Sequence, residues 1–292
     1  MRTLALLLML FALPAAATHE PGHPGQYPQD KDKWWWDNAW WERGTMPAAR
    51  NHEVVAREAA YRNADVEVPV AIYRPKEAGV FPVVVFLHGR RGVDEVTRLA
   101  PLRIAARGFT VVAPDLYAGR FIDKFPIRHD YALEDDAAAS IDFALSLPEA
   151  QGQARTCVVS HTRGGYYALK AIVTRKRAER TACYVSYYPH WQDPNAPEPM
   201  QVYQYAPELD ALGVPVLVFL GEHEQYQRYR SILAGMDALR DRKRDARVIV
   251  YPGVGRGFDF RPPNVRTLAD DLATQDSLQR AAAFMRKHLG AR

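Results

Sequence analysis

The chain has 292 residues, a formal net charge of +4 at pH 7 and 48% hydrophobic residues, which suits a globular protein with one large domain. Basic and acidic residues are interspersed and the positive excess is small, so the composition argues against a dedicated nucleic-acid-binding protein.

The first 17 residues have the pattern of a targeting segment. Arg2 is followed by an apolar run up to Leu13 and by small residues, which is typical of a secretory signal peptide. The run is shorter than the ~20 residues that a membrane-spanning helix needs. We therefore expect residues 1–17 to be removed and the mature protein, with no transmembrane segment, to be exported to the periplasm or the extracellular space.

Residues 18–50 differ in composition from the rest of the chain. They include a cluster of tryptophans, whose large apolar areas are unfavourable in water: Trp34, Trp35, Trp36, Trp40 and Trp41. We expect an N-terminal arm that packs over the following domain. The alternative is an aromatic surface that docks a protein partner, a glycan or a membrane.

From residue 51 to residue 292 the pattern predicts a single domain in which strands and helices alternate. We expect strands over 54–61, 66–74, 81–87, 109–113, 157–159, 182–188, 214–220 and 247–251. Helices are expected over 93–106, 131–147, 164–175, 225–242 and 268–289, and a Pro-rich loop over 189–207. The continuous apolar runs are typical of strands buried on both faces, so we predict an α/β fold with a mostly parallel sheet covered by helices on both sides.

The two cysteines open two of these strands. Cys157 and Cys183 should lie on neighbouring strands of the parallel sheet. A disulfide between them would fit an oxidising compartment. The alternative, two small buried core residues, is equally compatible with the pattern.

The segment from Ser160 to Gly165 lies between an apolar strand and a helical run, the setting of a nucleophile elbow. Such an elbow presents a Ser or Cys at a sharp turn, but its central residue here is Thr162. We expect Ser160 to lie too early for that role, with its side chain buried beneath the turn.

Several motifs in this order resemble the dienelactone hydrolase family of the α/β-hydrolase fold. They are VVVFLHGRRG at 83–92, APDLY at 113–117, the elbow, GEHE at 221–224 and YPGVGRGF at 251–258. The resemblance covers residues 66–289 and implies a single-domain α/β-hydrolase fold. Matched to the family, which typically uses Cys or Ser, an aspartate and a histidine, the nucleophile, acid and base positions hold Thr162, Glu224 and Arg256.

All three departures weaken the expected chemistry. Arg256 cannot act as a general base because a guanidinium group stays protonated, with a pKa above ~12. Thr162 is a hindered secondary alcohol, and threonine nucleophiles typically need a nearby amine or strong base. We therefore predict an exported, catalytically impaired protein that acts by binding a small ligand or a partner.

Other histidines leave an alternative open. His223 beside the acid position, or His161 beside Thr162, would serve as a relocated base in an active carboxylic-ester or lactone hydrolase. The common structural role, a hydrogen-bonded histidine, is favoured for both. His88 and Gly89 are expected to shape the oxyanion-hole turn. A third hypothesis is an envelope-assembly subunit that docks through the tryptophan-rich arm.

The arginines indicate what the site would bind. Arg163 and Arg256 would together hold a small anion, since guanidinium groups bind carboxylates through paired hydrogen bonds. The alternative, slightly favoured, is an internal ion pair between Arg256 and Glu224. The sequence shows no metal-ligand spacing and no glycine-rich phosphate loop, so we expect neither a metal nor a cofactor.

Overall fold

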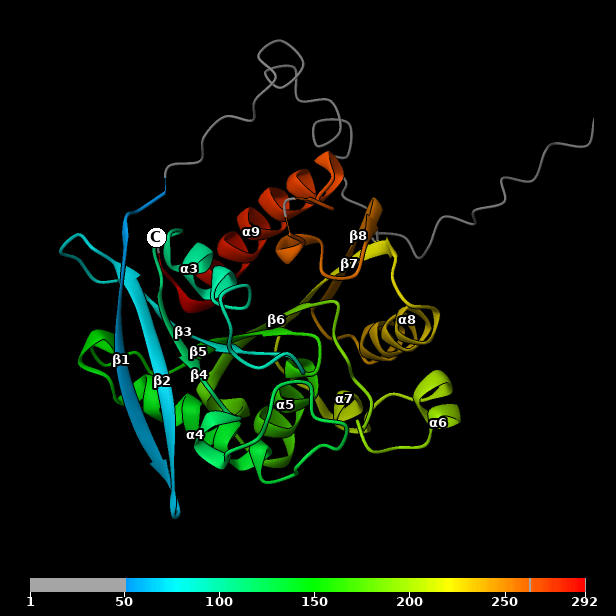
Figure 1. Ribbon diagram of the computed structural model, residues 1–292, viewed down its shortest axis with the longest axis horizontal. Coiled ribbons are helices and arrows are strands. Elements are labelled where there is room, and N and C mark those ends of the chain that lie inside the picture. The colour runs from blue at the N-terminus through cyan, green and yellow to red at the C-terminus, as the bar shows by residue number, and fades with distance from the viewer. Residues whose placement is uncertain (1–50, 263, 292) are drawn as a thin grey trace, which may run out of the picture.

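An eight-stranded sheet forms the centre of the structure, a computed structural model that describes residues 51–262 and 264–291 (Figure 1). The expected signal peptide and the tryptophan-rich arm lie outside the described residues. The strands are β1 (Val54–Asn63), β2 (Val66–Pro75), β3 (Val83–Leu87), β4 (Thr110–Pro114), β5 (Thr156–His161), β6 (Thr181–Tyr187), β7 (Val216–His223) and β8 (Ala246–Gly255). Their spatial order is β1-β2-β4-β3-β5-β6-β7-β8.

The sheet is parallel from β4 to β8, and β1 and β2 add an antiparallel edge. Every residue of β3, β4, β5 and β6 is buried, as the continuous apolar runs predicted. Parallel strands need long crossovers, which the helices supply. The predicted α/β architecture with a mostly parallel sheet is therefore confirmed.

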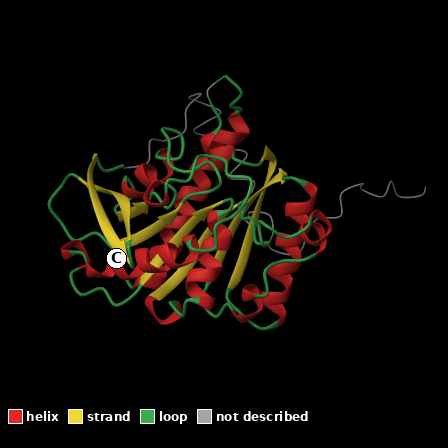
Figure 2. Cartoon of the chain, turned by 60° about the horizontal axis from the view of Figure 1, so that its bottom comes forward, coloured by secondary structure: helices red, strands yellow, loops and turns green. Residues whose placement is uncertain are grey.

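Helices cover both faces of the sheet (Figures 1 and 2). They are α3 (Leu99–Ala105), α4 (Leu133–Ser146), α5 (Gly164–Leu169), α6 (Glu198–Tyr203), α7 (Glu208–Ala211), α8 (Tyr226–Asp241) and α9 (Leu268–Leu289). Figure 1 shows α3 and α9 on one side of the sheet and α4 and α5 on the other. The long α9 begins with a capping box, in which Thr267 and Asp270 satisfy each other's backbone N–H groups.

Two segments differ from the sequence expectation. The helix predicted over 93–106 forms only over Leu99–Ala105, because the Asp94 side chain accepts the Thr97 N–H (2.9 Å) and holds the preceding residues in turns. The Pro-rich stretch 189–207 is not all loop, since it contains α6. Proline at the first helical positions favours a helix start, because its φ is already helical and its missing N–H is not needed.

The two cysteines form a disulfide between the neighbouring strands β5 and β6. Both cysteines are fully buried, Cys157 in the strand that leads to the elbow and Cys183 in the strand beside it. The two cysteines are separated by 26 positions in the sequence. In the loop-closure model, such a cross-link stabilises the folded state by about 3.5 kcal/mol because it lowers the entropy of the unfolded chain. The disulfide, rather than the pair of free core thiols, is thus the alternative that the structure contains.

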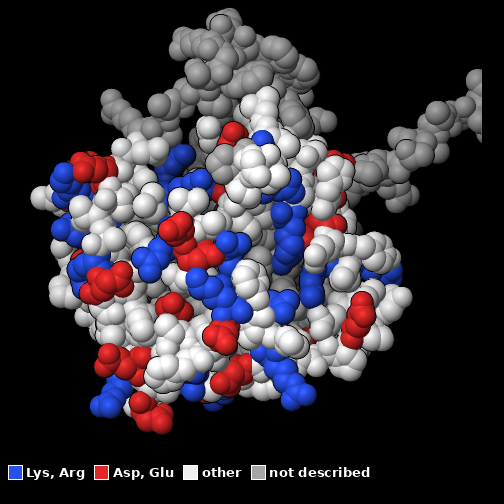
Figure 3. Space-filling view, in the orientation of Figure 1, with Lys and Arg blue, Asp and Glu red and all other residues white. Residues whose placement is uncertain are grey.

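Figure 3 shows how charge is distributed on one face of the molecule. Basic and acidic side chains are interspersed over most of it, and Lys and Arg side chains gather near its centre. None of the helices that the structure describes has both the length and the apolar character that crossing a bilayer requires.

Candidate active site

The elbow between β5 and α5 has the sharp geometry that the motif predicted. Thr162 has φ +48°, a left-handed conformation that is unfavourable for a β-branched residue. Its N–H donates to the Tyr187 carbonyl (3.2 Å), which ties the elbow to the end of β6. At Gly164 a Cβ atom would lie 2.3 Å from the Leu87 carbonyl oxygen, so only glycine allows α5 to start this close to β3.

The Thr162 hydroxyl faces the turn that follows β3. A Cβ atom at Gly89 would lie 1.8 Å from Thr162 Oγ1, so this glycine makes room for the hydroxyl. Within residues 51–262 and 264–291, no imidazole nitrogen or carboxylate hydrogen-bonds to that oxygen. Ser160 is fully buried, as expected, and its Oγ contacts Ser186 Oγ at 2.8 Å.

His88 holds this turn in place. Its Nε2 accepts the Leu116 N–H (3.1 Å), which assigns the ring proton to Nδ1 and makes Nδ1 the donor to the Gly89 carbonyl (2.8 Å). Burial is the main cause that lowers the pKa of His88, so the ring stays neutral. His88 therefore contacts the turn that we expected it to shape.

The predicted acid and base positions meet as an ion pair. Arg256 Nη1 donates to Glu224 Oε1 (2.9 Å), and the same oxygen accepts the Gln225 N–H (2.9 Å). The guanidinium group also lies over the Tyr188 ring, 5.4 Å from its centroid. Glu224 Oε2 is buried without a hydrogen-bond partner among the described residues.

The two histidines considered as relocated bases lie elsewhere. His161 Nε2 is 3.4 Å from Asp259 Oδ2, and Tyr188 donates a short hydrogen bond to the same carboxylate. Burial lowers the pKa of His161, and its ring packs edge-on against Phe86. His223 is exposed at the end of β7 and pairs with Gly255 in the sheet register.

Three arginines lie around the elbow. Arg163 is only 5% exposed; its Nη1 donates to the Pro126 carbonyl (3.4 Å) and its Nε has no partner among the described residues. Arg228 donates to the amide oxygens of Gln192 (2.8 Å) and Gln201 (3.0 Å). Burial first, and then repulsion from Arg256, lowers the pKa of Arg228 to about 10. The hydrogen bond to Gln192 joins Arg228 to the segment that follows β6.

A fourth histidine belongs to the same group. The His190 N–H donates to the Thr162 carbonyl (2.8 Å), while its Nε2 is buried without a partner in the part of the chain that the structure describes. Burial, and then repulsion from Arg228, Arg256 and Arg163, holds the pKa of His190 well below its usual value. The elbow thus combines three guanidinium groups, one neutral imidazole and the carboxylate of Glu224.

The comparisons with known proteins place this geometry in a family. The model of the family described as "Dienelactone hydrolase family" matches residues 68–289, most of the chain. The chain belongs to the dienelactone hydrolase family. A protein of Escherichia coli named "Putative carboxymethylenebutenolidase" is 26% identical over 240 residues, which is 78% of this chain and 87% of that protein.

Two further matches to this dienelactone hydrolase family member cover a shorter stretch of sequence or have a lower sequence identity. "Chlorophyllase type 0" of Chenopodium album is 45% identical over 73 residues, only 25% of this chain and 20% of that protein. The crystal structure of a "Putative Dienelactone Hydrolase" from Klebsiella pneumoniae has a TM-score of 0.65 at 20% identity and covers 81% of this chain and 100% of that one. That likeness shows the shared fold.

Sequence reasoning named the elbow, Glu224 and Arg256, but it missed His190 and Arg228. Both carried a positional signal. His190 comes soon after a strand predicted to be buried, and Arg228 lies in the first turn of the helix after the acid position. The carboxyl ends of parallel strands share one edge of the sheet, where α/β proteins bind their ligands. Polar residues following each strand are therefore candidates for the same site.

Proposed function

We propose that this dienelactone hydrolase family member binds a small anionic ligand at the elbow and hydrolyses esters slowly or not at all. The observation that carries the proposal is the Arg256–Glu224 ion pair at the base and acid positions. A permanently protonated guanidinium group there cannot accept the proton that the Thr162 hydroxyl must lose on attack.

The placement of the other titratable groups supports impaired catalysis. His161 is paired with Asp259 and His223 is exposed, so neither occupies the family's base position. Thr162 itself carries a methyl group beside its oxygen. A misplaced or missing base typically costs several orders of magnitude in rate.

The balance of buried charge supports an anionic ligand. Arg228 is bound to neutral amide oxygens, and Arg163 keeps an unpaired buried Nε. Among the described residues, Arg256 is thus the one cation of the three that forms an ion pair with a carboxylate, that of Glu224. Uncompensated buried charge is unfavourable, and a carboxylate or similar anion would relieve it. Guanidinium groups also match the planar, two-oxygen shape of a carboxylate.

Hydrolysis of a panel of p-nitrophenyl esters tests the catalytic part of the proposal. We expect the wild-type rate to match the uncatalysed rate and Thr162→Ala to change nothing. Hydrolysis that disappears in Thr162→Ala, and in either His161→Ala or His223→Ala, would instead establish an active esterase with a relocated base. Retained heat stability of each variant is the control for folding.

Export is the second part of the proposal. It rests on the signal-like residues 1–17 and on the Cys157–Cys183 disulfide, which is typical of oxidising compartments. We expect protein recovered from a bacterial periplasm or culture medium to lack residues 1–17, by mass spectrometry, and to show no free thiol when denatured without reductant. Cytoplasmic protein with two free thiols would contradict export.

Docking of a partner through the tryptophan-rich arm stays a hypothesis, which deletion of residues 18–50 would test.

A further inference from the structure

One loop near the elbow exposes apolar side chains to water. It comprises residues 121–131 and is called the apolar loop below; it lies between the turn Ala118–Arg120 and α4. Phe121 is 97% exposed, Ile127 is 87% exposed and Phe125 is 53% exposed. Single exposed apolar side chains are common on protein surfaces, but three on one short loop call for an explanation.

Hydrogen bonds hold the first half of the apolar loop against the turn after β3. The Phe125 N–H donates to the Arg90 carbonyl (3.0 Å). The Arg90 guanidinium group donates in return to the carbonyls of Phe125 (3.0 Å) and Pro126 (2.9 Å). The loop backbone is therefore fixed, while the side chains that it carries stay exposed.

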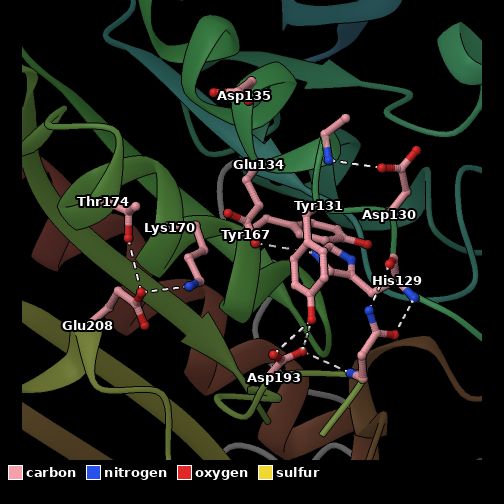
Figure 4. Close-up of polar contacts among 12 residues, drawn as sticks. His129, Asp130, Tyr131, Glu134, Asp135, Tyr167, Lys170, Thr174, Asp193 and Glu208 are labelled. Carbon is pink, nitrogen blue, oxygen red and sulfur yellow. Dashed lines mark hydrogen bonds and ion pairs between the residues drawn. The ribbon is translucent and has the colours of Figure 1, made fainter.

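The second half of the loop is joined to the segment that follows β6 (Figure 4). The His129 N–H donates to Asn195 Oδ1 (2.8 Å), and Asn195 Nδ2 donates to the His129 carbonyl (2.9 Å). Tyr131 donates to the Asp193 carboxylate (2.9 Å), and the buried His129 ring stacks on Tyr167 with centroids 5.3 Å apart. These contacts join the second half of the loop to the segment that follows β6, beside the elbow.

The backbone is strained where the loop displays its aromatic rings. Phe121 has φ +56° and Phe125 has φ +58°, left-handed conformations that cost bulky residues free energy. Burial in this domain does not offset that cost for Phe121, which is 97% exposed. It offsets only part of it for Phe125, which is 53% exposed and has the Arg91 guanidinium group 5.8 Å from its ring centroid. A strained backbone that displays aromatic rings to water is explained if those rings are buried against a binding partner.

The charges around the apolar side chains indicate what that surface is. Lys124 and Arg128 are exposed and form no ion pair with a described residue. Arg90 uses its donors on carbonyl oxygens, which leave its charge unneutralised. The acidic residues of the apolar loop are Asp123 and Asp130, so that, with Arg90, three cations and two anions surround the apolar side chains. Apolar tips flanked by unpaired cations are typical of protein segments that insert into anionic membranes.

We propose that the apolar loop docks this protein on a lipid bilayer that contains anionic headgroups. Phe121, Phe125 and Ile127 enter the boundary between headgroups and acyl chains, while Lys124 and Arg128 contact the headgroups. The exposed cations Lys124 and Arg128 beside the apolar side chains favour an anionic lipid surface as the occupant. Arg163 contacts the loop at Pro126, so docking would bring the elbow to the membrane surface.

Sedimentation with lipid vesicles tests the proposal on the purified protein. We expect it to partition onto vesicles of equal parts phosphatidylglycerol and phosphatidylcholine, and much more weakly onto phosphatidylcholine alone. Phe121→Ser with Ile127→Ser should lower the partition coefficient at least tenfold, because two inserted side chains are lost. Lys124→Glu with Arg128→Glu should lower it at least tenfold on the anionic vesicles and leave the weak binding to phosphatidylcholine unchanged.

A matched control uses two exposed apolar residues elsewhere. Val80 is 66% exposed and Val265 is 55% exposed, and Val80→Ser with Val265→Ser should partition as the wild type does. Every substituted side chain is exposed, so the variants should unfold at the wild-type temperature. Wild-type partitioning in the Phe121→Ser, Ile127→Ser variant would overturn the proposal, as would equal wild-type binding to both kinds of vesicle.

Discussion

Thr162→Ser combined with Arg256→His is expected to give the protein measurable esterase activity. The substitutions place a primary hydroxyl at the elbow and an imidazole beside Glu224, whose Oε1 already accepts a hydrogen bond from the residue at 256. A positioned general base typically accelerates proton transfer by about 10²–10⁴-fold. We expect a gain of at least a hundredfold over wild type in the hydrolysis of p-nitrophenyl acetate.

Two further variants separate the effect of the hydroxyl at position 162 from the effect of the imidazole at position 256. Thr162→Ser alone should gain little, because Arg256 still occupies the predicted base position. Arg228→His with Thr162→Ser is a matched control, since it adds an imidazole to the same cationic group away from Glu224. A folded but inactive Thr162→Ser, Arg256→His variant would show that the scaffold has lost more than its base, and equal activity in the Arg228→His control would refute the assigned base position.

Acidification below pH 6.5 is expected to destabilise the fold steeply. Burial is the main cause that lowers the pKa of His88, His161 and His190 below the usual value. In the unfolded chain these groups titrate near ~6.5, so below that pH the unfolded state binds more protons than the folded state. The stabilisation is complete above pH 6.5 and is lost as the pH falls toward the folded-state pKa values.

The expected pH dependence of the unfolding free energy follows from the number of protons that are bound on unfolding. Each histidine that is neutral when folded and charged when unfolded contributes a slope of up to about 1.4 kcal/mol per pH unit, so three contribute up to about 4 kcal/mol per pH unit. Urea unfolding at pH 7.5, 6.0 and 5.0 measures how the free energy of unfolding changes with pH. Asp94, Glu149 and Glu208 have pKa values below their usual range, so their loss of stabilisation comes at lower pH.

A histidine variant identifies the source of this slope. His190→Asn should reduce the pH dependence of the unfolding free energy by about a third, whatever it does to stability at pH 7.5. The comparison uses the slope, so a general destabilisation does not obscure it. A slope equal to that of wild type would mean that His190 is not the buried neutral group described above.

The fold could be predicted from the sequence because its signals are local. A buried parallel strand needs an unbroken apolar run, and the runs around Val85, Val111 and Val158 lie in β3, β4 and β5. Helix ends were less certain, because they depend on single polar contacts such as Asp94 with the Thr97 N–H. The helix α6 was missed because its prolines suggested a loop.

At the candidate site, the sequence by itself determined which chemical groups stand at the positions that the resemblance assigns to the triad. It also determined that the guanidinium group of Arg256 cannot act as a general base. Only the tertiary structure decided which groups meet: His161 with Asp259, Cys157 with Cys183, and the His190 N–H with the Thr162 carbonyl. Ionisation is a property of the side chain and can be read from its identity. Pairing depends on how strands and loops distant in sequence come together at one edge of the sheet. Burial at that edge then decides whether the charged or the neutral form of each group is favoured.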